Sequence, residues 1–143
     1  MVKPSRQFSH ALRALVDLAL HQATGPVTTR SIAKRQKIPA RGLEQLFNRL
    51  KREGIVEAER GPRGGYRLRK LPREIHLSAV FRCIRSAAKA SAVSSYSADP
   101  TLKIWRQVEK AVETTLQSAT LETVVLQTGE HLPSPNHRYT FHI

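Results

Sequence analysis

A glycine-rich hairpin at residues 57–70, EAERGPRGGYRLRK, limits the folds that are open to this chain. Residues 57–60 and 66–69 read as two short strands joined by Gly-Pro and Gly-Gly pairs, which permit a tight reversal and positive φ angles. A hairpin with a purely structural role does not need so many cations. A solvated basic turn and a contact to a phosphate backbone both explain the hairpin taken alone. The five cations are Arg60, Arg63, Arg67, Arg69 and Lys70.

Three helical segments precede the hairpin. Apolar residues that recur every three or four positions predict these helices, and Gly25 with Pro26 ends the first of them. Thr28 or Thr29 is placed to cap the second helix, and Gly54 ends the third. The three helices are predicted over residues 8–23, 30–36 and 40–53.

The order helix, short helix, turn, helix and hairpin describes a winged helix-turn-helix. In that fold the second helix of the pair enters the major groove of DNA, while the hairpin, or wing, lies along the backbone. A tip of small residues can enter a minor groove about 6 Å wide. An arginine at the base of the tip is attracted by the negative potential of a narrow groove. This order therefore favours a phosphate contact over a solvated turn.

The distribution of charge points to the same partner. Residues 1–85 hold 19 of the 24 Lys and Arg residues and 6 of the 11 Asp and Glu residues, which accounts for the whole net charge of +13. The first part of the chain is therefore predicted to bind a polyanion, and residues 86–143 are neutral overall.

Other features exclude several classes of protein. A single cysteine excludes an intramolecular disulfide framework. No apolar run approaches the length of a membrane span, and the N-terminus lacks a signal-peptide core, so we expect a soluble cytoplasmic protein without a membrane partner. We find no nucleophile–base pair, phosphate-cradling loop or paired carboxylates, so an enzyme is not expected.

Four stretches carry a resemblance to a known family: HALRALVDLAL, GPVTTRSIAKRQKIPARGLEQLFNRLKREGIV, RGPRGGYRL and TLETVV. Over roughly residues 8–126 the chain resembles the Rrf-two (Rrf-type) bacterial transcriptional regulators, among them iron–sulfur, nitric-oxide and cysteine-metabolism regulators. The resemblance implies a mainly α fold with a small β-hairpin. It divides the chain into a winged helix-turn-helix domain (1–85), a sensor-type loop (86–99), a dimerisation helix with a short last helix (100–126) and a tail (127–143).

The resemblance also implies a function. Family members are homodimers that bind a pseudo-palindromic operator in double-stranded DNA, most often as repressors, and they respond to a redox, metal or metabolite signal. Two alternatives stay open: a regulator that acts mainly in a complex with a metabolic enzyme, and a non-specific nucleic-acid binder. A small effector is a further candidate partner.

An apolar stripe marks the expected dimerisation helix, which Pro100 can open. A stripe on a long helix outside a compact domain needs a partner, and a second copy of the chain is the simplest one. Packing against its own winged domain is the alternative, and both can be partly true. The stripe consists of Leu102, Trp105, Val108, Val112 and Leu116.

The start of the third helix is where base contacts are expected. Arg41 can read guanine or hold a phosphate, Glu44 can accept from cytosine, and Gln45 can pair with adenine. The resemblance implies base readout by Glu44 and minor-groove entry by Arg60. Any single cation can instead be a solvated surface charge. The DNA-contact candidates are Thr28, Thr29, Arg30, Pro39, Ala40, Arg41, Glu44, Gln45, Arg49, Arg60, Gly61, Arg63 and Gly64, with Ser5 as a further phosphate candidate.

The chain departs from the family at residues 86–99, SAAKASAVSSYSAD. Many relatives hold an iron–sulfur cluster there with three cysteine thiolates, the ligands that such a cluster needs, and this segment has none. No cofactor and no metal are therefore predicted, and an iron–sulfur cluster is conceivable only with non-standard ligands. Natural loss of the cluster and engineered replacement of cysteines by Ala and Ser both explain the segment.

Two residues are sensor candidates. Cys83 is predicted on the flank of a helix over residues 77–85, within reach of solvent, where a semi-buried structural cysteine and a thiol switch are the alternatives. His10 stands where the family usually has tyrosine, either as a polar residue of the core or as part of a sensor pocket.

Overall fold

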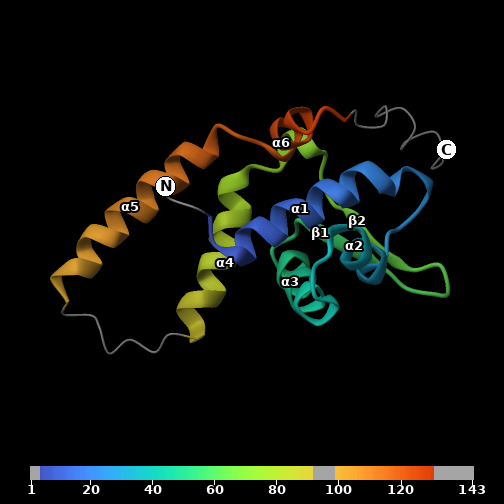
Figure 1. Ribbon diagram of the computed structural model, residues 1–143, viewed down its shortest axis with the longest axis horizontal. Helices are drawn as coiled ribbons and strands as arrows, with labels where there is room; N and C mark the ends of the chain where they lie inside the picture. Colours follow the sequence, from blue (N-terminus) through green and yellow to red (C-terminus); the bar gives the residue numbers. More distant parts are fainter. Residues whose placement is uncertain (1–3, 92–98, 131–143) are drawn as a thin grey trace.

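The computed structural model describes residues 4–91 and 99–130, and Figure 1 shows the arrangement of their elements. The fold is mainly α-helical with one small antiparallel hairpin, which confirms the expected fold class. The helices and strands are α1 (Arg6–His21), α2 (Thr29–Gln36), α3 (Ala40–Arg52), β1 (Val56–Glu59), β2 (Gly65–Leu68), α4 (Leu77–Ser91), α5 (Pro100–Gln117) and α6 (Leu121–Gln127).

The hairpin is tied to the segment that precedes α2. β1 and β2 pair from Val56 opposite Leu68 to Glu59 opposite Gly65, so each strand begins one residue earlier than predicted. Val27 then pairs with Tyr66 through two backbone hydrogen bonds of 2.7 and 2.9 Å. The wing is therefore anchored beside the first turn of α2.

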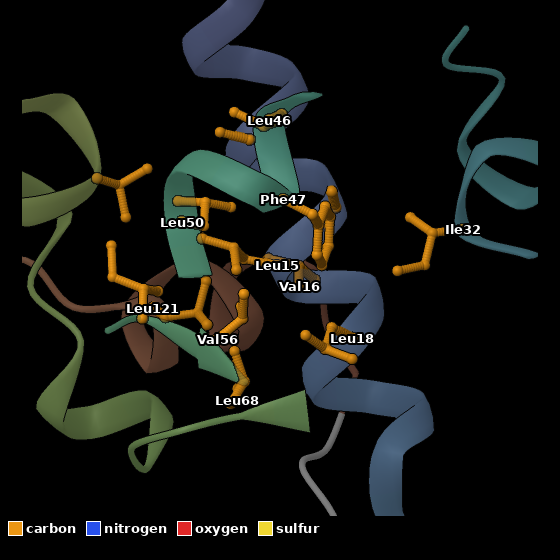
Figure 2. Close-up of a cluster of buried hydrophobic side chains, with 14 of the residues drawn as sticks. Leu15, Val16, Leu18, Ile32, Leu46, Phe47, Leu50, Val56, Leu68 and Leu121 are labelled. Atoms are coloured by element: carbon orange, nitrogen blue, oxygen red, sulfur yellow. The ribbon is translucent and has the colours of Figure 1, made fainter. Parts of the chain in front are cut away.

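One apolar core joins α1, α3, the hairpin and α6. Leu15 of α1, Phe47 of α3, Val56 of β1 and Leu121 of α6 are all fully buried, and Figure 2 shows most of this cluster. The phenyl ring of Phe47 also contacts the ring of Tyr66, with centroids 4.9 Å apart. Because α3 and the hairpin share this core, their relative position is fixed by packing.

The helix α4 is longer than predicted. Residues 86–91 were expected to belong to a loop, but α4 continues to Ser91. The physical reason is the alanine content of this stretch, since alanine has the highest helix propensity. Residues 92–98 of the expected sensor-type loop and residues 131–143 of the tail lie outside the described residues.

The helix α5 lies on one side of the body formed by the other helices (Figure 1). Ion pairs join it to α4: Glu113 lies 3.1 Å from both Arg82 and Arg85, and Glu109 lies 3.8 Å from Arg85. None of the helices within residues 4–91 and 99–130 is both long and apolar enough to span a bilayer.

Candidate nucleic-acid interface

The helix α3 has one buried side and one exposed side. Leu43, Leu46, Phe47 and Leu50 are buried in the core. The opposite side of α3 carries an exposed polar stripe, whose residues lie three or four positions apart along the helix. The stripe consists of Arg41, Glu44, Gln45, Asn48 and Arg52. The buried side therefore fixes α3 on the core, and its exposed side presents a row of hydrogen-bond donors and acceptors to solvent.

Asn48 and Arg52 extend the stripe beyond the residues that were predicted from the sequence. Both lie in register with Arg41 and Glu44, so the spacing of three, four and seven residues could have identified them. Arg49 lies to one side of the stripe and is half-buried.

The start of α2 carries three of the predicted contact residues. The Thr28 hydroxyl accepts a hydrogen bond from the Ser31 backbone N–H at 3.2 Å, so the predicted cap is confirmed at Thr28. Thr29 is half-buried, while Arg30 is exposed. At the start of α1, Ser5 has the same capping role, with its hydroxyl 3.2 Å from the Phe8 backbone nitrogen.

The five cations of the hairpin do not share one environment. The Arg67 side chain is only 19% exposed, and its Nε donates to Glu59 at 2.7 Å while its Nη1 donates to the Gln22 carbonyl at 3.3 Å. Its charge is therefore neutralised within the fold. Arg60 and Arg63 are exposed at the tip, and Arg69 and Lys70 are exposed beyond β2.

Two glycines of the wing have steric reasons for their identity. A Cβ at Gly64 would lie 2.4 Å from the Glu59 carbonyl oxygen, and a Cβ at Gly65 would lie 2.6 Å from the Val27 carbonyl oxygen. Both values are far below van der Waals contact. Gly64, predicted as a DNA contact, therefore has a steric role in the turn, whereas at Gly61 the added Cβ would meet nothing within 4 Å.

The two sensor candidates differ in exposure. The Cys83 side chain is 5% exposed and belongs to the core, which favours the structural cysteine over a thiol within reach of solvent. Burial, reinforced by Glu53, raises the pKa of the Cys83 thiol and so disfavours the reactive thiolate. The spacing on α4 placed Cys83 beside the apolar face, and the packing of the fold covers that flank as well.

His10 on α1 is half-buried. Burial, followed by the charges of Arg13 and Arg6, lowers the pKa of its imidazole. His10 is therefore held in its neutral form more firmly than an exposed histidine.

Residues 4–127 match the protein family described as Rrf2, iron-dependent transcriptional regulator. The chain belongs to the Rrf2 family. An HTH-type transcriptional regulator of Synechocystis is 35% identical over 127 residues, which cover 84% of this chain and 85% of that protein. This result confirms the resemblance found in the sequence.

Solved structures of Rrf2-type regulators are also similar. IscR of T. potens superposes with a TM-score of 0.69 at 31% identity, over 98% of this chain and 96% of IscR. CymR of B. subtilis, described as the global cysteine regulator, has a TM-score of 0.67 at 28% identity, over 89% of this chain and 98% of CymR. As an Rrf2 member this chain is a DNA-binding transcriptional regulator with a winged helix-turn-helix, and its relatives are regulators rather than enzymes.

The residues that the structure describes do not offer the donors of an iron–sulfur cluster. Such a cluster is held mainly by cysteine thiolates, and the one cysteine of the sequence, Cys83, is buried with a raised pKa. Within the described ranges no three His, Cys, Asp or Glu side chains gather as a metal site would require. The iron dependence in the family description therefore has no matching donor set in the part of the chain that the structure describes.

Proposed function

We propose that this chain is a homodimeric, sequence-specific regulator that represses transcription from a pseudo-palindromic operator in the cytoplasm. The exposed polar stripe on α3 carries the proposal, because it offers arginine, carboxylate and amide groups at the spacing of a groove-reading helix. Arg41, Glu44 and Gln45 read base edges in the major groove, where Pro39 and Ala40 at the start of α3 approach the DNA. Asn48 adds a further amide.

The wing and the start of α2 supply the backbone contacts. Arg60 enters the minor groove from the base of the wing tip, where Gly61 allows close approach, and Arg63 contacts phosphate. The further phosphate contacts in this proposal are Thr28, Thr29, Arg30 and Arg49.

The outer face of α5 supports the homodimer. Ile104, Trp105, Val108 and Val112 are large apolar side chains, between 38% and 64% exposed. Ile104 and Val108 lie on the side of α5 turned away from Glu113, which pairs with α4. Trp105 and Val112 border Glu109, which lies four residues after Trp105. A twin α5 would cover this face. Of the predicted stripe, Leu116 instead packs against the core of its own chain and Leu102 is half-buried.

The dimer is tested by a charge placed on this face. Val108→Glu should produce a monomer in analytical ultracentrifugation, because a carboxylate would be buried between two apolar helices. Lys110→Gln is the matched control: it makes the same change of net charge at an exposed position outside the apolar face, and it should remain dimeric. A dimeric Val108→Glu protein would contradict the proposal for α5.

DNA recognition is tested with duplexes selected by the wild-type protein from a randomised pool. Gln45→Ala should relax the preference at one base position, with a loss of about 1–3 kcal/mol for the selected sequence. Arg60→Ala should weaken binding and reduce the dependence of affinity on salt. Lys103→Ala on α5 is the control, and it should leave both quantities unchanged. A pool that shows no enrichment would exclude sequence-specific recognition and favour the non-specific binder.

The signal is proposed to act between α4 and α5, since these helices flank residues 92–98. A redox, metal or metabolite signal there would shift α5 against α4 and change the spacing of the two α3 helices, which must match half-sites about 34–36 Å apart. Operator affinity should therefore change when the protein is treated with oxidant, divalent metal or extract metabolites. An affinity that is unaltered by all three would leave an enzyme partner as the source of regulation.

A further inference from the structure

A buried carboxylate joins α1 to the last turn of α2. The Asp17 side chain is 1% exposed, and Arg35 donates to it from Nε at 3.0 and 3.2 Å and from Nη2 at 2.6 Å. The Gln36 side-chain amide donates a further hydrogen bond at 3.0 Å. We call Asp17, Arg35 and Gln36 the α1–α2 clamp.

The clamp acts at the end of α2 that leads to α3. Arg13 of α1 also donates to the Gln36 backbone carbonyl. Lys37 then adopts a left-handed conformation with φ 54°, and the Ile38 backbone nitrogen donates to the Ala33 carbonyl at 3.0 Å. Three residues separate Gln36 from Ala40, the first residue of α3. Any rotation of the last turn of α2 would therefore be passed on to the start of α3.

Few residues of α2 itself pack in the core. Only Ile32 and Ala33 of its eight residues are buried. Val27 and Ile38, on either side of α2, are buried and hold its ends. The fork of Arg35 on the Asp17 carboxylate adds a contact that fixes direction as well as distance. The Asp17 carboxylate is buried whereas the Arg35 side chain is 37% exposed, and an ion pair of this kind is weak evidence for stability.

We propose that Asp17 is a positioning residue for DNA recognition, which orients α3 through the end of α2. The inference rests on the proposed sequence-specific function and names a residue that does not touch DNA. It predicts a change of DNA affinity opposite in sign to the change expected from net charge alone. Asp17→Asn removes a negative charge and would by charge alone strengthen binding to phosphate, yet we expect it to weaken binding to the preferred sequence.

The test compares two duplexes by fluorescence anisotropy: the sequence that the wild-type protein selects from a randomised pool, and a scrambled duplex of the same composition. Asp17→Asn should bind the selected duplex about tenfold more weakly, while its affinity for the scrambled duplex stays the same or rises. Glu122→Gln on α6 makes the same change of charge and should keep the wild-type ratio of the two affinities. The folded fraction of each variant is measured by circular dichroism under the same conditions.

Arg35→Lys is the second variant, for the case in which Asp17→Asn does not fold. It keeps the cation but loses the fork, so the ratio of the two affinities should fall with no change of net charge. A proportional loss of both affinities would mean that the clamp only stabilises the fold, and a wild-type ratio would mean that it does not position α3; either result overturns the inference. If the wild-type protein itself selects no sequence, the proposed function fails and the inference fails with it.

Discussion

Replacement of Gly65 by alanine tests how the wing is attached to the body. Gly65 begins β2 with φ 156°, a value that side-chain-bearing residues rarely adopt. An added Cβ would lie 2.6 Å from the carbonyl oxygen of Val27, 2.7 Å from its carbonyl carbon and 3.0 Å from its nitrogen. All three atoms belong to the backbone, so no side-chain rotation can relieve the contact.

The expected loss of stability follows from the contacts between Val27 and Tyr66 that an alanine at Gly65 would push apart. Val27 and Tyr66 exchange two backbone hydrogen bonds of 2.7 and 2.9 Å, and both must lengthen or break if the two segments move apart. A backbone hydrogen bond contributes about 0.5–1.5 kcal/mol net, and an unfavourable φ adds about 1 kcal/mol or more. Gly65→Ala should therefore lower the free energy of unfolding by about 2–4 kcal/mol.

Urea unfolding followed by circular dichroism measures this difference. Gly42→Ala is the matched control, since Gly42 lies on the exposed surface of α3 and a Cβ there would meet nothing within 4 Å. Alanine at that position should stabilise the protein by about 0.5–1 kcal/mol. Hydrogen exchange of the Tyr66 amide should accelerate in Gly65→Ala and not in Gly42→Ala. A Gly65→Ala protein within about 0.5 kcal/mol of wild type would refute the argument that Val27 anchors the wing.

Three further predictions concern ionisable groups. Glu113→Gln breaks ion pairs of 3.1 Å to Arg82 and Arg85 and should lower the free energy of unfolding by about 1 kcal/mol at low salt, and by less at high salt, in urea titrations. Because burial raises the pKa of Cys83, stability is fully present below the ordinary thiol pKa of about 8.5 and decreases as pH rises above it; Cys83→Ala should show a smaller decrease. Because burial lowers the pKa of His10, stability is present above about pH 6.5 and is lost as pH falls; the melting temperature of His10→Gln should fall less on acidification.

The helices and the hairpin were predictable because each one depends on residues that are close together in the sequence. Apolar spacing located α1, α2 and α3, and a threonine before α2 identified its cap. The hairpin was predicted from its glycines, although each strand begins one residue earlier. At β1 the reason is Val56, which is buried and pairs with Leu68. The strand was predicted to begin at the polar Glu57, and this prediction missed the apolar residue before it.

The sites were predicted less completely, because exposure depends on contacts between distant segments. Sequence placed Arg67 with the DNA-facing cations, but Gln22 and Glu59 hold it within the fold. Cys83 was placed on a helix flank, and the sequence contains no local sign that the core covers that flank. The exposed polar stripe of α3 was predicted in part, because one helix with four apolar residues on one side must present the other side to solvent.

The two sides of α5 make different contacts, and this difference suggests where motion occurs. Toward its own chain, α5 pairs Glu113 with Arg82 and Arg85 and packs Leu116 against the core. Trp105, at 61% exposure, and its apolar neighbours are exposed. Partly exposed ion pairs each contribute about 0–1 kcal/mol, whereas one large apolar side chain contributes about 1.5–3 kcal/mol when it is covered. In the proposed dimer, the apolar contacts of a twin α5 would therefore outweigh the ion pairs that join α5 to α4. If the chain forms the proposed dimer, we expect a signal to break the ion pairs between α4 and α5 before the contacts between the two α5 helices.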